Sequence, residues 1–115
     1  MKALLVDDTH PLLEEGLIAG GLQVIREFEA PLATLAQQHA DTEVIIIRSR
    51  LKVSADFLKA FPQLKVIGRL GAGLENIDLN EAARRHITCL RVPEGNARAV
   101  AEHALGMLLS LLNHL

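Results

Sequence analysis

The residues whose types and spacing point most directly to ligand chemistry form the segment VIGRLGAGLENID at positions 66–78. This segment follows an apolar run, precedes a helical pattern and contains a Gly-x-Gly that begins at Gly71. It falls short of the dinucleotide-binding fingerprint, because Asn76 stands where the third glycine is expected. What it predicts is a turn of small residues whose backbone N–H groups could bind an anion such as a carboxylate.

A second candidate is the sequence Arg48-Ser49-Arg50, which follows four consecutive β-branched residues at positions 44–47. A guanidinium group at the end of a strand suits a carboxylate or a phosphate, because it can donate two parallel, charge-assisted hydrogen bonds. We therefore take Arg48 as a candidate anion ligand. Arg50 is expected to be a surface residue.

Asp7 and Asp8 follow the first apolar run and could form an acidic metal pocket, as in a phospho-receiver signalling domain. A receiver also needs an aspartate after its third strand, where this sequence has Arg48, and a lysine after its fifth, where it has Arg91-Val92-Pro93. The receiver hypothesis therefore fails. Asp7 and Asp8 are expected to be strand-end and helix-capping residues.

Other reactive side chains give no site. No histidine has Cys, Asp or Glu at metal-binding spacing on one face, so no metal site is predicted; the histidines are at positions 10, 39, 86, 103 and 114. No acid–base pair emerges either, and no catalytic residue is assigned. Cys89 lies in a predicted strand, where a buried and inert thiol is expected.

Short apolar runs alternate with helical patterns along the chain. Strands are predicted at 3–6, 22–25, 44–47, 65–70 and 87–92, and helices at 9–20, 31–38, 54–61, 78–86 and from 96 onward. Ser54 is a predicted N-cap, and Asp78 with Glu81 has the spacing of a capping box. The alternation predicts an α/β domain, a flavodoxin-like five-stranded parallel sheet with helices on both faces. In such sheets ligands bind at the carboxyl ends of the strands, where both candidate anion sites fall.

Length and charge narrow the function further. A chain of 115 residues with net charge −2 and no basic block fits one domain and argues against nucleic acid or an anionic membrane as partner. One cysteine allows no intrachain disulfide, and no signal-peptide pattern opens the chain. A cytoplasmic protein is expected.

The last predicted helix, residues 97–115, is apolar in nearly every direction around its axis. Such a helix needs cover on all sides, and one sheet covers only one face. One interpretation is a terminal core helix; the other, which we favour, is a helix that packs against a domain or subunit outside this chain. The chain on its own is then expected to self-associate through this helix.

Four segments taken together resemble a known family: residues 44–49, residues 66–78, Val92-Pro-Glu-Gly-Asn96 and Val100-Ala-Glu-His-Ala104. In this order and spacing they resemble the N-terminal part of the NAD-dependent D-2-hydroxyacid dehydrogenases. That family joins a flavodoxin-like substrate-binding domain to a separate Rossmann domain. Its members transfer a hydride between a 2-hydroxy (or 2-oxo) acid and nicotinamide.

The resemblance implies a role for each matching position. The backbone N–H groups of Ala72, Gly73 and Leu74 would bind the substrate carboxylate. Arg48 and Ser49 would approach the distal group, a phosphate if the substrate is phosphoglycerate. Asn96 and Val100 would lie near the nicotinamide of NAD.

The resemblance also implies what this chain does not contain. Residues 1–96 would be the substrate-binding domain, and 97–115 a helix that crosses to a Rossmann domain and contributes to a homodimer interface. The family's glycine fingerprint and catalytic Arg, Glu and His come later in the chain than Leu115, so the 115 residues alone are expected to be inactive. The alternative is a non-catalytic small-anion-binding domain of the same fold.

Overall fold

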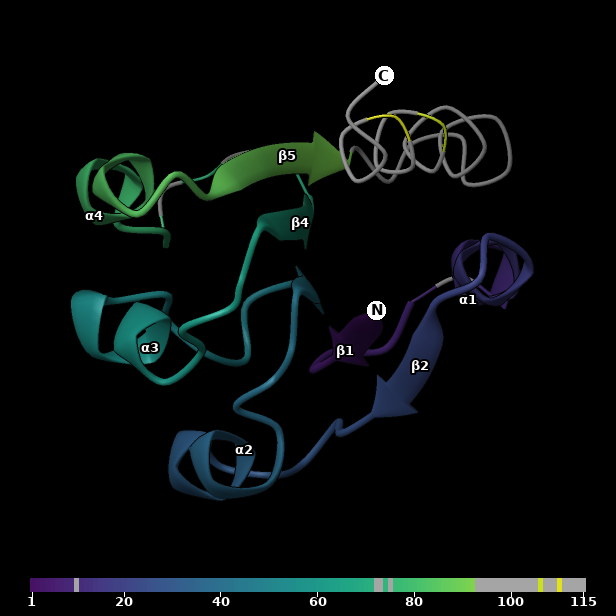
Figure 1. Ribbon diagram of the computed structural model, residues 1–115, viewed down its shortest axis with the longest axis horizontal. Helices are drawn as coiled ribbons and strands as arrows, with labels where there is room; N and C mark the ends of the chain where they lie inside the picture. The colour runs from purple at the N-terminus through teal and green to yellow at the C-terminus, as the bar shows by residue number, and fades with distance from the viewer. Residues whose placement is uncertain (10, 72–73, 75, 93–105, 107–109, 111–115) are drawn as a thin grey trace.

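The computed structural model describes residues 1–9, 11–71, 74, 76–92, 106 and 110, and shows one five-stranded parallel sheet in the order β2-β1-β3-β4-β5 (Figure 1). This is the flavodoxin-like strand order. The predicted fold class is confirmed.

Every strand overlaps its predicted range, and the short helices begin close to their predicted starts. The elements are β1 Lys2–Leu5, α1 Pro11–Ala19, β2 Gln23–Arg26, α2 Leu32–Gln38, β3 Val44–Ile47, α3 Ala55–Lys59, β4 Val66–Leu70, α4 Leu79–Arg84 and β5 Thr88–Val92. β3 matches its prediction at both ends. Its four side chains are fully buried, as expected for a central strand covered on both faces.

The two faces of the sheet carry separate cores. On one face, alternate strand residues such as Leu4, Ile45 and Ile67 pack with side chains from α2, α3 and α4. On the other face, residues such as Leu5 and Ile46 pack against α1. Figure 1 shows α1 on the opposite side of the sheet from α2, α3 and α4. Two buried faces explain why the central strands are apolar without alternation.

Local signals fix where the helices begin and end. The Ser54 side chain accepts a hydrogen bond from the Phe57 amide at 3.3 Å and caps α3, as predicted. After α1, Gly21 adopts φ = 93°, while the Leu22 amide donates to the Leu17 carbonyl at 3.1 Å. This is a Schellman ending, and it places Leu22 next to Leu17 in the core.

Only half of the predicted capping box at α4 is present. The Asp78 side chain accepts from the Glu81 amide at 3.1 Å, but the Asp78 amide donates to the Val53 carbonyl instead of to Glu81. The helix also ends earlier than predicted. His86 lies beyond it in a left-handed conformation, with φ = 59°, where glycine is the usual residue.

The predicted final helix falls almost wholly outside the described residues, so its packing and the boundary at residue 96 stay predictions. Among the helices that the structure does describe, none is long and apolar enough to span a membrane.

Candidate functional site

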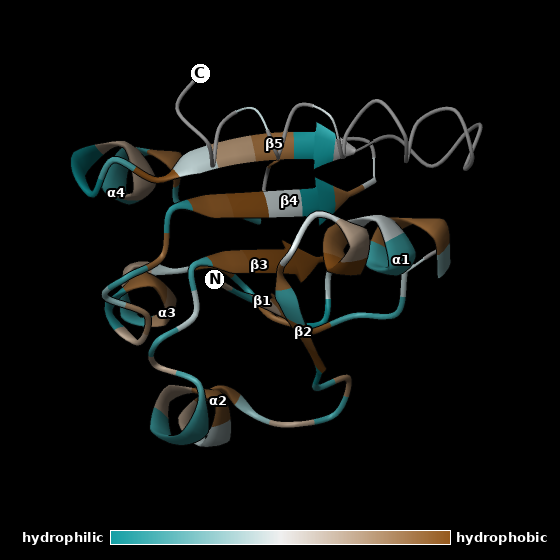
Figure 2. Ribbon diagram, turned by 45° about the vertical axis from the view of Figure 1, so that its right-hand side comes forward, coloured by the Kyte–Doolittle hydropathy of each residue, from teal (hydrophilic) through white to brown (hydrophobic). Residues whose placement is uncertain are grey.

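The candidate site lies at the carboxyl ends of β3 and β4. These strands are hydrogen-bonded neighbours, with Ile47 paired to Arg69, so the loops that leave them start side by side. β4 and β5 become hydrophilic near their carboxyl tips, whereas β3 is apolar to its end (Figure 2). Arg48 is the first polar residue after β3, and it is exposed.

Asp7 holds the start of the loop after β3. Its carboxylate accepts a hydrogen bond from the Arg48 amide at 2.6 Å and a longer one from the Arg50 amide at 3.4 Å. The Arg48 Nε donates to the carbonyl of Asp8 at 2.9 Å, which fixes the direction of its guanidinium group. Asp7 is therefore not only a residue at the end of a strand: its carboxylate also positions the backbone of Arg48, the candidate anion ligand.

The prediction for Arg50 was wrong, because this side chain is half-buried. Its three guanidinium nitrogens donate to the carbonyls of Val6, Ala30 and Glu27 at 2.8, 2.8 and 2.9 Å. These carbonyls lie at the ends of β1 and β2, next to the switch point between β1 and β3 where flavodoxin-like sheets usually bind ligands. Here the guanidinium satisfies those groups, which leaves the β3–β4 side as the candidate anion site.

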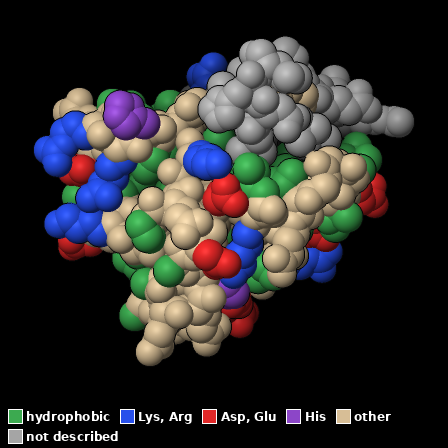
Figure 3. All heavy atoms as spheres, in the orientation of Figure 1, with side chains coloured by type: hydrophobic (Ala, Val, Ile, Leu, Met, Phe, Trp, Pro, Cys, Tyr) green, Lys and Arg blue, Asp and Glu red, His purple; other side chains and the backbone are tan. Residues whose placement is uncertain are grey.

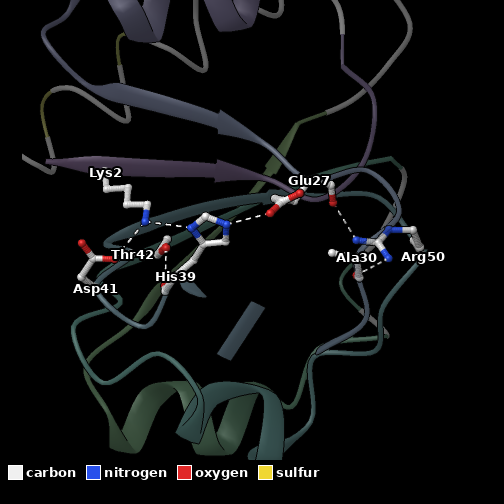
Figure 4. A network of polar contacts seen from close by, with 7 residues as sticks. All are labelled: Lys2, Glu27, Ala30, His39, Asp41, Thr42 and Arg50. Carbon is white, nitrogen blue, oxygen red and sulfur yellow. Dashed lines mark hydrogen bonds and ion pairs between the residues drawn. The ribbon is translucent and has the colours of Figure 1, made fainter. Parts of the chain in front are cut away.

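A line of polar contacts continues from Arg50 toward the start of β1 (Figure 4). His39 follows α2 and bonds through Nε2 to the Glu27 carboxylate at 2.8 Å, and its Nδ1 accepts from Lys2 Nζ at 2.9 Å. Because lysine only donates, Nδ1 is the acceptor and Nε2 carries the proton given to Glu27. The residue whose carbonyl binds Arg50 is thus itself held in place by His39.

The loop after β4 begins at Gly71, which has φ = 135°. A Cβ atom at this position would lie 2.5 Å from Arg69 Nη1, so a larger residue would be strained and would also collide with Arg69. The Arg69 Nε donates to Asn76 Oδ1 at 2.8 Å. One side-chain hydrogen bond therefore joins the two ends of the loop.

The loops after β3 and β4 contact each other directly. Val53 and Ile77 form a parallel β-bridge, in which the Val53 amide donates to the Asn76 carbonyl at 2.9 Å. The Asn76 Nδ2 also donates to the Arg48 carbonyl at 3.4 Å. Arg48 and the candidate anion loop, which the sequence could only place at the same edge, are therefore connected through Asn76.

The other predicted ligands are partly described. Ser49 is exposed beside Arg48, and Leu74 is partly buried, with its carbonyl accepting from the Ile77 amide at 3.0 Å. The remaining four, Ala72, Gly73, Asn96 and Val100, lie outside the described residues. Sequence reasoning missed the roles of Arg50, Arg69 and Asn76. For Asn76 a signal existed, because it replaces a glycine in a near-fingerprint.

Charge near the site is mixed. The ends of β3, β4 and β5 carry Arg48, Arg69 and Arg91, while Asp7 and Asp8 follow β1. Acidic and basic side chains are likewise interspersed on the face seen in Figure 3. Within the described ranges, no three His, Cys, Asp or Glu side chains lie together in a way that could hold a metal ion. Burial raises the pKa of the half-buried Cys89 thiol, which favours its protonated form over the reactive thiolate.

Sequence comparison relates this chain to a known family of dehydrogenases. Residues 3–107 match the family model described as D-isomer specific 2-hydroxyacid dehydrogenase, catalytic domain. The chain is 38% identical over 110 residues to D-3-phosphoglycerate dehydrogenase from Sus scrofa. The aligned residues make up 96% of this chain and 21% of that protein. The chain thus spans about a fifth of the length of the curated relatives it matches.

Solved structures agree in fold. The NAD⁺-bound 3-phosphoglycerate dehydrogenase from Entamoeba histolytica has a TM-score of 0.69 at 26% identity, over 96% of this chain and 38% of that one. The apo form of D-lactate dehydrogenase from Escherichia coli has a TM-score of 0.67 at 26% identity, over 96% of this chain and 36% of that one.

Proposed function

The chain belongs to the D-isomer specific 2-hydroxyacid dehydrogenase family, and we propose that it forms the substrate-binding part of an NAD-dependent enzyme acting on a small D-2-hydroxy acid. The observation that carries this proposal is the contact of the Arg48 segment with Asn76, in the loop after β4, which brings a cation close to the segment that carries the proposed carboxylate ligands. A 2-hydroxy acid with a second anionic group needs both.

The substrate we propose is D-3-phosphoglycerate, oxidised at its 2-hydroxyl group to 3-phosphohydroxypyruvate, a reaction that would serve serine biosynthesis. Two observations support it: the relatives at 35–38% identity are named D-3-phosphoglycerate dehydrogenase, and Arg48 suits a phosphate. Arg48 and Ser49 would bind the phosphate. The amides of Ala72, Gly73 and Leu74 would bind the carboxylate.

The loop after β4 does not fit the diphosphate of NAD. A dinucleotide loop needs a third glycine for close approach to the following helix. Here that position holds Asn76, whose side chain is hydrogen-bonded to Arg69 and Arg48. We therefore assign this loop to the acid substrate. In our proposal NAD is bound mainly by another domain, with Asn96 and Val100 of this chain near its nicotinamide.

Three further features belong to the proposal. The 115 residues would bind the acid without oxidising it, because they span only about a fifth of the length of the relatives that are named as the dehydrogenase. The apolar sequence of residues 97–115 supports a homodimer formed through that region. The kinship with dehydrogenases of small acids supports a cytoplasmic location.

Calorimetric titration with D-3-phosphoglycerate, D-glycerate and inorganic phosphate tests the function. We expect D-3-phosphoglycerate to bind tightest, because it alone offers a carboxylate and a phosphate to the two loops. Arg48→Gln should remove most of that preference, whereas Arg84→Gln, an exposed arginine on α4, should not. Equal binding of all three ligands would favour a general anion-binding domain, and binding of none would contradict the proposal.

A further inference from the structure

We infer that Asn76 is a positioning residue: its side chain connects the Arg48 segment to Arg69 at the end of β4, and so holds the proposed phosphate ligand in place for an acid with a second anionic group. The inference rests on the proposed function, because it assigns one end of the substrate to each loop. It starts from two contacts, Arg69 Nε to Asn76 Oδ1 at 2.8 Å and Asn76 Nδ2 to the Arg48 carbonyl at 3.4 Å.

The chemistry of the two partners determines how the Asn76 amide is oriented. An arginine Nε can only donate, and a backbone carbonyl can only accept. The Asn76 oxygen must therefore face Arg69, and its NH₂ group must face Arg48. A side chain at this position needs an acceptor and a donor on one short planar group. Aspartate lacks the donor, and alanine and serine cannot reach both partners.

The backbone of Asn76 is anchored separately from its side chain. Its carbonyl accepts from the Val53 amide at 2.9 Å, and the Asp78 amide donates to the Val53 carbonyl at 2.8 Å. Val53 and Ile77, which form this bridge, are 0% and 7% exposed and belong to the core. Removal of the Asn76 side chain leaves the bridge in place, so such a variant is expected to fold.

The side chain then has a function that the bridge does not have. It connects the end of β4, through Arg69, to the residue that carries the proposed phosphate ligand. Without it, the carbonyl of Arg48 loses its partner on the β4 side, while the contacts of the Arg48 segment to Asp7 and Asp8 remain. A ligand that reaches both loops should suffer from this change, whereas a ligand that reaches only the loop after β4 should not.

D-3-phosphoglycerate and D-glycerate form the matched pair of probes, because they differ only in the phosphate. The experiment measures the dissociation constants of both for the full chain by calorimetry, together with thermal unfolding. Asn76→Ala should lower the preference for the phosphorylated acid about tenfold while D-glycerate binding changes less than about twofold, as expected when one charge-assisted contact is misplaced. Asn80→Ala, an exposed asparagine on α4, is the control and should preserve the preference.

Arg69→Gln should act in the same direction, since it removes the group that orients the amide. Arg91→Gln removes the same charge from the register partner of Arg69 on β5 and controls for long-range attraction. Its effect on the preference should be smaller. In the double variant with Asn76→Ala, Arg69→Gln should add little, because both changes break one connection.

The outcomes separate the two proposals. If wild type prefers D-3-phosphoglycerate and Asn76→Ala keeps that preference, or weakens both acids equally, the inference is wrong and the function stands. If wild type binds neither acid, the proposed function fails and the inference fails with it. Should Asn76→Ala not fold, Asn76→Ser replaces it, with the same expected loss and the same contradicting result.

Discussion

Arg50 Nε donates to the Val6 carbonyl at 2.8 Å, so the segment after β3 is hydrogen-bonded to the end of β1. The other two guanidinium nitrogens bind carbonyls in the turn after β2. One side chain thus links the ends of three neighbouring strands, β2, β1 and β3, whereas the candidate site joins β3 to β4. With Asp7 it holds the segment that presents Arg48.

Replacement of Arg50 should therefore cost stability. Arg50→Ala leaves three carbonyls without their charged donor, and we expect the free energy of unfolding to fall by about 2–3 kcal/mol. Chemical denaturation measures this loss. Arg26→Ala is the control, because it removes an exposed arginine that pairs with Glu14, and its effect should be clearly smaller. Equal losses for the two variants would show that the three hydrogen bonds of Arg50 do not stabilise the fold as expected.

The left-handed conformation of His86 predicts a stabilising substitution. A non-glycine residue at φ = 59° is strained, so His86→Gly should raise the free energy of unfolding by about 0.5–1 kcal/mol. The reverse change at the end of α1, Gly21→Ala, should destabilise by a similar amount, since no atom lies within 4 Å of the added Cβ and only the backbone conformation is affected. A destabilised His86→Gly variant would contradict the described helix ending.

The ion pair between Arg26 and Glu14 predicts a pH dependence. The hydrogen bond from Arg26 lowers the pKa of Glu14 below its usual 4.5, so the folded state favours the ionised carboxyl group. This contribution is fully present above about pH 4.5 and is lost as pH falls through the lowered pKa of the folded state. The stability difference between wild type and Arg26→Ala should therefore be constant near neutral pH and shrink in acid. In a Glu14→Gln background the same substitution should show no such dependence; a difference that grew in acid would reverse the assigned sign.

Cys89 should react slowly with thiol reagents. Because burial raises the pKa of its thiol, the thiolate is scarce at neutral pH. We expect alkylation by iodoacetamide at pH 7.5 to be much slower in the folded chain than in urea, as followed by mass spectrometry. Equal rates in the two conditions would mean that the thiol is accessible and unprotected.

The strands were predictable from sequence because each is a short apolar run that the sheet buries. Residues 44–47 illustrate this, since four β-branched residues fit only a strand covered on both faces. The helix starts that have a side-chain cap, at Ser54 and Asp78, could be predicted equally well. These signals depend only on neighbouring residues, and both capping hydrogen bonds are present in the structure.

The roles that sequence reasoning missed depend on groups far away in the chain. Arg50 is half-buried because the carbonyls of residues 6, 27 and 30 converge on it. The sequence around position 50 contains no signal for these distant partners. The second half of the capping box at Asp78 was lost for a similar reason, because Val53 competes for its amide. In the sequence Asn76 is only a departure from a glycine motif, whereas in the structure its side chain is hydrogen-bonded to both Arg69 and Arg48.

Whether the acid binds at the carboxyl ends of β3 and β4 can be measured by titrating the ¹⁵N-labelled chain with D-3-phosphoglycerate and recording ¹H–¹⁵N correlation spectra. We expect the amide signals of Arg48, Ser49 and Leu74 to shift and saturate together, whereas those of Glu27 and Ala30, whose carbonyls bind Arg50, should stay in place. Shifts confined to residues 27–30, or no shifts at all, would contradict binding at this site.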